Sequence, residues 1–338
     1  MKKITLILST ALATTALAQT ALDSVPAGFT TLTVAANGGS GAKLTFGALG
    51  ITQAVEWQGT STALSGATLT DSAAAWADNQ FNGANGQFYL EFTSVGGSTV
   101  AAGVGTSFAI TATAASAKTI TLATAPGLVS PVGYRVRKYW TLADIFGAAN
   151  SVGLNGGTAT SADQVQIWNG AGLDTFYYQT TGIGGTGWRK TNARSTDAST
   201  SIIPPSAALI VKRGSNATVS LVANGSMKTG QTTATIASGY TFVGNPFDIA
   251  MTLASSGIYA AGLAGGTAAS ADQVLVWNGA TFDAYFYQTS GGTGTGWRKT
   301  TDLAADASAT ALAAGSGFVV KRSGAAFTWA IPQHPSAL

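Results

Sequence analysis

The sequence predicts an all-β protein in which a small N-terminal β domain precedes two tandem, sandwich-like β-meander repeat units. Helical periodicity is nearly absent along the 338 residues, and short runs of β-branched and aromatic residues alternate between Gly, Asn and Ser. An ungapped internal repeat has an offset of 109 residues, and 27 of 53 positions are identical between residues 161–213 and 270–322. A duplicated unit presents like groups twice, which suits structural stacking or multivalent binding better than one catalytic site.

The chain begins with residues typical of a secretory signal peptide. Lys2 and Lys3 precede an apolar stretch over residues 4–17, and Ala16-Leu17-Ala18 has the small-x-small pattern of a cleavage site. The stretch is shorter than the roughly 20 residues that cross a bilayer, and no later segment is long and apolar enough to do so. We therefore expect residues 1–18 to be removed and the protein to be exported to the periplasm, the cell surface or the extracellular space.

The composition excludes several classes of protein. Charged residues make up 9% of the chain, against about 25% in ordinary soluble proteins. Without the two leader lysines, 15 of the 17 Lys and Arg residues face 14 Asp and Glu, so the net charge is about +1. This balance argues against a nucleic-acid binder, which needs a basic excess. The absence of cysteine excludes disulfides, a thiol nucleophile and thiolate metal sites.

The N-terminal β domain is expected over residues 19–139. Runs of β-branched and aromatic residues predict its strands at 29–34, 43–46, 87–92, 107–113 and 119–123. The stretch 69–122, with its pattern TDS…W…G…IT…TITL, resembles a compact β motif of surface and phage structural proteins. That resemblance implies a fold and no activity.

The repeat units are expected over residues 140–227 and 228–338. Alternation in the first unit places Val165 and Ile167 on one face and Trp168 on the other, and Asn169-Gly170 predicts a two-residue hairpin turn. Further strands are expected at 176–179, 188–190, 209–212, 218–222, 232–236, 273–277, 285–288, 297–299 and 318–321, and short helices or loops at 142–149 and 249–255. Four short strands bury little alone, so the units should pack on each other or on neighbouring segments.

The order of the repeated motifs supports a family resemblance. WNG, an aromatic strand, GWRK and a glycine-led apolar strand that closes on VKR occur in tandem behind a signal peptide and a small β domain. This order resembles a family of exported bacterial proteins of unknown function. The resemblance covers most of the mature chain and implies no established activity.

No catalytic, metal or cofactor site is expected. The single His334 excludes histidine-based triads and argues against a zinc site, and no D-x-D-x-D-G calcium loop is present. Three aspartates recur in both copies: Asp163, Asp174 and Asp197 correspond to Asp272, Asp283 and Asp306. Recurrence favours turn and cap roles over the paired carboxylates of a glycoside hydrolase.

Repeated aromatic and basic residues are the candidates for ligand binding. They are Trp168, Trp188, Arg189, Lys190, Trp277, Trp297, Arg298 and Lys299. Exposed tryptophans can stack on sugar rings, and the basic residues can grip an acidic polysaccharide or an acidic subunit. The favoured alternative is that the tryptophans fill a core or the seam between the repeats, while the basic residues protect strand edges and pair with the repeated aspartates.

The sequence therefore favours a non-enzymatic exported structural protein of the cell surface, extracellular matrix or an appendage. Self-association through sheet edges or repeated surfaces would be its mechanism. The alternative is a bivalent carbohydrate-binding protein, with acidic or neutral polysaccharide as ligand, that uses the repeated Trp and Arg/Lys positions. A third hypothesis is a hydrolase with a site between the N-terminal domain and the repeats.

Overall fold

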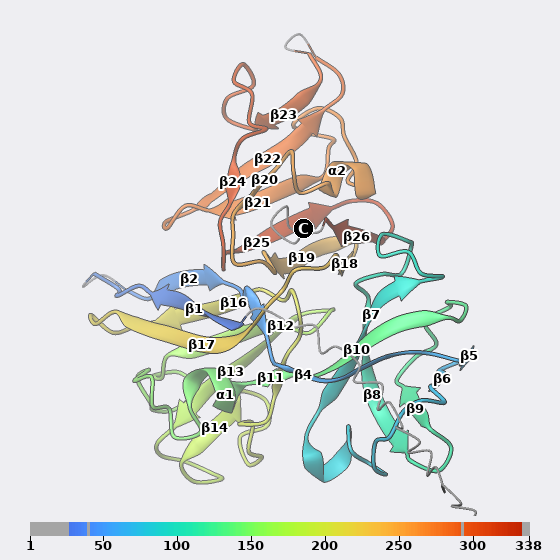
Figure 1. The fold of residues 1–338 in the computed structure, drawn as a ribbon. Coiled ribbons are helices and arrows are strands. Elements are labelled where there is room, and N and C mark those ends of the chain that lie inside the picture. The colour runs from blue at the N-terminus through green and yellow to red at the C-terminus, as the bar shows by residue number, and fades with distance from the viewer. Residues whose placement is uncertain (1–26, 39–40, 292–293, 333–338) are drawn as a thin grey trace, which may run out of the picture.

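Antiparallel β-sheets make up the protein in a computed structural model that describes residues 27–38, 41–291 and 294–332 (Figure 1). Within these residues no helix exceeds five residues, so the all-β prediction is confirmed. The expected signal peptide, residues 1–18, and His334 lie outside the described residues.

The first repeat unit, at the lower left of Figure 1, is a β sandwich. Its elements are β1 (Ala27–Val34), β2 (Lys43–Gly47), β3 (Ile51–Thr52), β11 (Trp140–Thr141), α1 (Leu142–Phe146), β12 (Gln164–Trp168), β13 (Leu173–Gln179), β14 (Gly187–Lys190), β15 (Ile202–Ile203), β16 (Leu209–Arg213) and β17 (Val219–Met227). One sheet has the order β14-β13-β12-β16-β2, and a second has the order β1-β17-β3. Both sheets contribute side chains to one core, which includes Val34, Val165, Trp188 and Leu221.

The second repeat unit, at the top of Figure 1, has its own core. Its elements are β18 (Thr232–Ile236), β19 (Gly239–Gly244), β20 (Met251–Thr252), α2 (Ile258–Ala261), β21 (Gln273–Trp277), β22 (Phe282–Gln288), β23 (Gly296–Lys299), β24 (Ala311–Leu312), β25 (Gly317–Arg322) and β26 (Phe327–Ile331). The main sheet has the order β19-β25-β21-β22-β23, and β18 pairs with β26. The strand order therefore matches that of the first unit, with β19 in the place of β2 and β18 in the place of β1.

The small β domain, at the lower right of Figure 1, forms a third core. Its elements are β4 (Val55–Thr60), β5 (Ala63–Ser65), β6 (Thr68–Thr70), η1 (Gly83–Asn85), β7 (Phe88–Val95), β8 (Ser107–Ala114), β9 (Thr119–Leu122) and β10 (Val132–Lys138). The strands form one antiparallel sheet in the order β4-β10-β7-β8-β9-β6-β5. Its core is rich in aromatic rings, including Trp76, Phe81 and Phe92.

The small domain lies inside the first repeat unit and not in front of it. β1 pairs with β17 and β2 pairs with β16, so residues 27–52 belong to the first unit. In the second unit, residues 245–250 connect β19 directly to β20. At the corresponding place in the first unit, the chain forms β4 to β10. The expected N-terminal domain 19–139 is therefore not a single domain. Its first strands, β1 and β2, pair with β17 and β16 of the first repeat unit. We call residues 55–138 the inserted domain.

Residues 249–255, expected as a short helix or a loop, form a tight turn in which Thr252 and Ser255 exchange hydrogen bonds, and α2 follows this turn. The Asn169-Gly170 hairpin is a four-residue loop, in which the Asn169 side chain accepts hydrogen bonds from the amides of Ala171 and Gly172. The sequence did not predict β4, β10, β19 or β26.

Candidate functional site

Trp188 and Trp297 lie in the cores of the two repeat units. Their exposed fractions are 0% and 3%, and each ring meets a tyrosine edge to face, Tyr178 in the first unit and Tyr287 in the second. The Trp188 indole N–H donates to the carbonyl of Gly147 at 2.9 Å. Because both indoles are covered, neither can stack on a sugar. These two tryptophans fill the cores of their units, as the alternative interpretation of the sequence expected.

Arg189 and Arg298 are almost as deeply buried as their tryptophan neighbours. Arg189 donates to the carbonyl of Trp188 at 2.8 Å, to the carbonyl of Gly185 at 3.2 Å and to the carbonyl of Gly184. Arg298 donates to the carbonyl of Trp297 at 2.8 Å. These guanidinium groups bind the backbone of the chain itself, and that of Arg189 shapes the glycine-rich loop before its strand.

The repeated basic residues pair with the repeated aspartates. Lys190 lies 2.8 Å from Asp174, and Lys299 lies 2.9 Å from Asp283. The hydrogen bond from Lys299 to Asp283 raises the pKa of the Lys299 ammonium. The remaining pairs are Arg189 with Asp197, Arg298 with Asp306, Arg213 with Asp163 and Arg322 with Asp272. A continuous basic stripe for an acidic polysaccharide does not result from this arrangement.

Trp168 and Trp277 lie at the seam between the repeat units. Trp168 of the first unit contacts Phe242 of the second, with ring centroids 5.4 Å apart. Trp277 of the second unit contacts Phe46 of the first at 5.2 Å. Because Phe46 and Phe242 occupy corresponding positions on β2 and β19, the two contacts are reciprocal. These two tryptophans therefore pack in the seam between the repeat units, as the alternative interpretation of the sequence expected.

Backbone hydrogen bonds between the two units are reciprocal as well. The amide of Ala48 donates to the carbonyl of Gly315 at 2.8 Å, and the amide of Gly244 donates to the carbonyl of Ser206 at 2.9 Å. Ser206 and Gly315 hold the same positive φ of 62° at corresponding positions. The two units thus meet as the subunits of an isologous homodimer do, within one chain.

A hollow of about 420 Å³ lies beside Trp168. It brings Trp168, Asp174 and Lys190 together with Gln87 of the inserted domain, whose side chain donates to the carbonyl of Thr200 at 3.0 Å. The second unit has no inserted domain, and there Trp277 packs against Phe46 and Phe282 instead. The duplicated residues therefore do not form two equal binding sites.

A different hollow of about 540 Å³ opens on the second unit. Trp297 and Arg298 contribute to it, together with Tyr259 and Tyr287, whose rings stack 3.5 Å apart. Aromatic walls with a few polar groups are typical of small-molecule sites.

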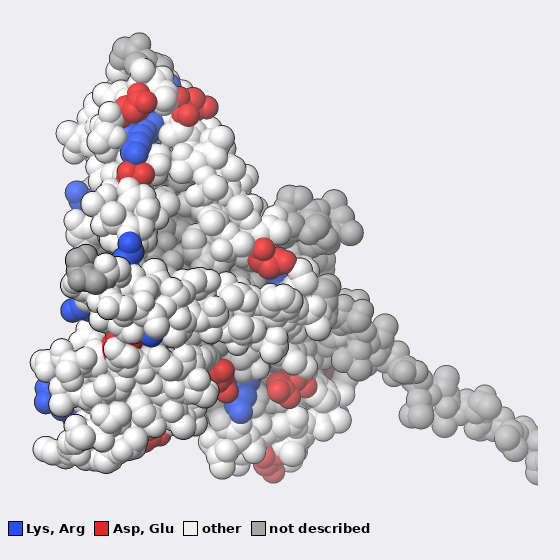
Figure 2. All heavy atoms as spheres, turned by 90° about the vertical axis from the view of Figure 1, so that its left-hand side faces the viewer, with Lys and Arg blue, Asp and Glu red and all other residues white. Residues whose placement is uncertain are grey.

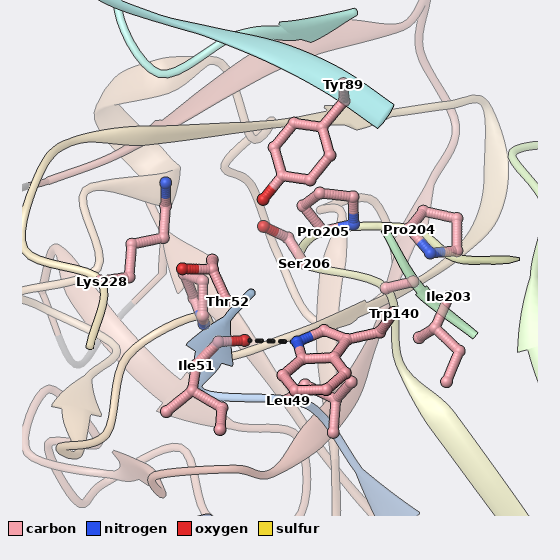
Figure 3. A pocket seen from close by; sticks show the side chains of 12 residues that line it. Leu49, Ile51, Thr52, Tyr89, Trp140, Ile203, Pro204, Pro205, Ser206 and Lys228 are labelled. Carbon is pink, nitrogen blue, oxygen red and sulfur yellow. Dashed lines mark hydrogen bonds between the residues drawn. The ribbon is translucent and has the colours of Figure 1, made fainter. Parts of the chain in front are cut away.

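A small cavity of about 20 Å³ lies where the three parts meet (Figure 3). Tyr89 of the inserted domain points toward Ser206, and the Trp140 indole donates to the carbonyl of Ile51 at 3.2 Å. Burial raises the pKa of Tyr89 above its ordinary range. Because the space admits about one water molecule, this cavity is a packing feature and not a ligand site.

Strand β1 forms the free edge of its sheet. Its counterpart β18 is covered, because the Thr233 amide donates to the carbonyl of Gly105 in the inserted domain at 3.1 Å. The corresponding residue in β1 is Thr31, whose amide donates to no group of the described chain outside β17. Neither β1 nor β17 contains a charged residue. Figure 2 shows the face that lies at the left of Figure 1, where β1 and β17 are, and there scattered charged side chains lie among a larger uncharged surface.

Scans of the chain against protein-family models and against curated proteins gave no match. Among residues 27–38, 41–291 and 294–332, no three His, Asp or Glu side chains gather as metal ligands would. None of the helices in that part has the length and apolarity to cross a bilayer.

Proposed function

We propose that this is a non-enzymatic exported structural protein of the cell surface, extracellular matrix or an appendage, and that copies associate through β1. The observation that carries the proposal is the uncovered edge of this eight-residue, charge-free strand. Natural proteins protect such edges with lysines, prolines, bulges or covering loops, because the unpaired amides and carbonyls template pairing with another chain. Among the described residues, β18 is covered in this way and β1 is not.

Exposed apolar side chains extend the surface next to this edge. Phe29 is 70% exposed and Val222 is 52% exposed. Val222 pairs with Thr31, two residues from Phe29, so both apolar side chains lie on one face of the sheet. Pairing of two β1 strands would place the same face of both sheets side by side, so that these apolar side chains flank the joint in one continuous sheet.

A second copy of this chain fits the edge well. Two β1 strands can pair antiparallel around a two-fold axis, which makes the interface isologous. Because the strand carries no charge, self-pairing opposes no like charges. The unit of assembly would then be a dimer, and a further surface would extend it into a larger structure.

The experiment that tests the proposal is light scattering of residues 19–338 over a wide range of concentrations. We expect the mass to rise to at least that of a dimer. Thr33→Lys, which adds a charge at an exposed position of β1, should shift the transition to at least tenfold higher concentration. Thr235→Lys is the matched control, because it changes the corresponding exposed residue of the covered strand β18. A mass that stays monomeric throughout would exclude the proposal.

Carbohydrate binding is the second candidate function, and the hollow beside Trp168 favours it. A partly exposed indole next to Asp174, Lys190 and Gln87 offers an apolar face and hydrogen-bonding groups to a sugar. A chain that is monomeric and is retained by glycans would support this candidate. Trp168→Ala should then abolish retention, whereas Trp277→Ala, which changes the corresponding residue without such a hollow, should not.

A further inference from the structure

A charged hollow of about 360 Å³ lies between the inserted domain and the segment that leads into the second repeat unit. Arg135 and Arg137 of β10 contribute to its wall, as do Glu91 of β7 and Lys228. Glu91 is the one carboxylate among the lining residues, so three cationic side chains share the hollow with a single acidic group. Arg137 and Lys228 by themselves carry one positive charge more than Glu91 can balance.

Two of these cations are buried. The exposed fractions of Arg137 and Lys228 are 2% and 8%, and that of Glu91 is 5%. The Lys228 ammonium donates to Oε1 of Glu91, whereas Nε of Arg137 lies 3.9 Å from Oε2, too far for a hydrogen bond. The Glu91 carboxylate is thus the nearby negative group for two buried positive charges, and the Lys228 ammonium lies closer to it than the Arg137 guanidinium does.

The guanidinium of Arg137 has an unused donor. Nη1 donates to the carbonyl of Gln53, but Nε is buried and has no hydrogen-bond partner in the described chain. Burial lowers the pKa of Arg137, because its charged form is removed from water, and Glu91 offsets this only in part. A buried cation with a free N–H is stabilised by an anion that accepts from it.

Polar groups suited to an anion line the rest of the hollow. Hydroxyl groups of Thr93, Ser94, Thr99 and Thr229 are present together with the amide of Gln231. Hydroxyl and guanidinium donors are the usual partners of sulfate, phosphate and carboxylate oxygens. The lining residues come from β7, β10, the loop between β7 and β8, and residues 228–231.

We propose that this hollow binds an oxyanion, which is a sulfate, phosphate or carboxylate group, between Arg135, Arg137 and Lys228. The group is either a free inorganic ion or a substituent of an acidic polysaccharide. Binding would hold residues 228–231 against the inserted domain, at a junction where Gln231 already donates to the carbonyl of Val104 at 3.0 Å. The site is independent of the β1 edge and of any self-association.

Isothermal titration calorimetry with inorganic phosphate at constant ionic strength tests the site. We expect saturable binding with one site per chain. Arg135→Gln at the rim should weaken it at least tenfold, and Glu91→Gln, which removes the competing carboxylate, should strengthen it. Lys212→Gln is the matched control, because it removes an exposed positive charge from another part of the surface.

Displacement experiments and chemical shifts distinguish a free inorganic ion from a polysaccharide substituent and locate the site. A sulfated or uronic-acid oligosaccharide that displaces phosphate would identify a polysaccharide substituent, whereas displacement by inorganic sulfate alone would identify a free ion. Amide chemical shifts in 15N-labelled protein should change at 135–137 and 228–231 upon addition of phosphate. Absence of saturable binding, or equal weakening by Lys212→Gln and Arg135→Gln, would overturn the proposal.

Discussion

The buried pair Asp163 and Arg213 should stabilise the first repeat unit strongly. Asp163 accepts hydrogen bonds from the amides of Asn155 and Gly214, each at 2.8 Å, and lies 3.2 Å from Arg213. The side chains of the pair are 1% and 2% exposed. Asp163→Ala leaves a buried cation and two amides without an acceptor, which costs about 3 to 5 kcal/mol of unfolding free energy.

The second unit offers a matched comparison at Asp272. Its carboxylate binds the amides of Ala264 and Ser323, each at 2.9 Å, and Arg322 at 2.7 Å. Arg322 is 11% exposed and lies over the ring of Phe327, so it can reach water when the carboxylate is removed. We therefore expect Asp272→Ala to cost less, about 2 kcal/mol, which is the loss for the unsatisfied amides.

Urea denaturation followed by tryptophan fluorescence measures both costs, because tryptophans, Trp188 and Trp297 among them, lie in the cores of both units. Asp163→Ala should shift the unfolding midpoint of the first unit with little change in slope. A cost below about 1 kcal/mol for Asp163→Ala, or a larger cost for Asp272→Ala, would refute the reasoning from burial.

Two further predictions concern the seam and the response to alkali. A Cβ at Gly244 would lie 2.0 Å from Cβ of Ala48, so Gly244→Ala should cost about 1 to 3 kcal/mol in thermal unfolding, whereas Gly172→Ala, with no atom nearby, should be neutral. Burial raises the pKa values of Tyr89 and Tyr139, the latter to about 12. Their stabilisation is complete below pH about 10 and is lost as pH rises through the folded-state values, so absorbance at 295 nm should show these phenols ionising together with unfolding. Titration of all tyrosines near pH 10 in a folded chain would contradict this.

The inserted domain makes two similar units unlike in their surroundings. It covers the edge of β18 through Gly105, and it completes the hollow beside Trp168 through Gln87. Neither effect has a counterpart on the other unit. A duplication alone would present two equal surfaces, whereas the insertion covers the edge of one described sheet and completes one hollow beside an indole at the seam.

The sequence by itself determined the fold class and much of the local structure. Alternation with a period of two residues placed Val165 and Ile167 on the buried face, and both have exposed fractions of 3% or less. Asn169 and Gly170 marked a turn, and recurrence of the aspartates indicated that they bind the chain itself, as Asp163 does. These features depend on neighbours within a few residues or on an ungapped repeat, so they can be read from the order of residues.

Only the tertiary structure decided which strands pair and which indoles are covered. Leu32 pairs with Leu221 across the whole inserted domain, and no local pattern links two strands so far apart in the chain. Alternation separates the two faces of a strand, but packing against a second sheet buries Trp188 while packing against the other unit covers only part of Trp168. The sequence could not show these features because strand pairing and burial depend on contacts between segments that are far apart in the chain.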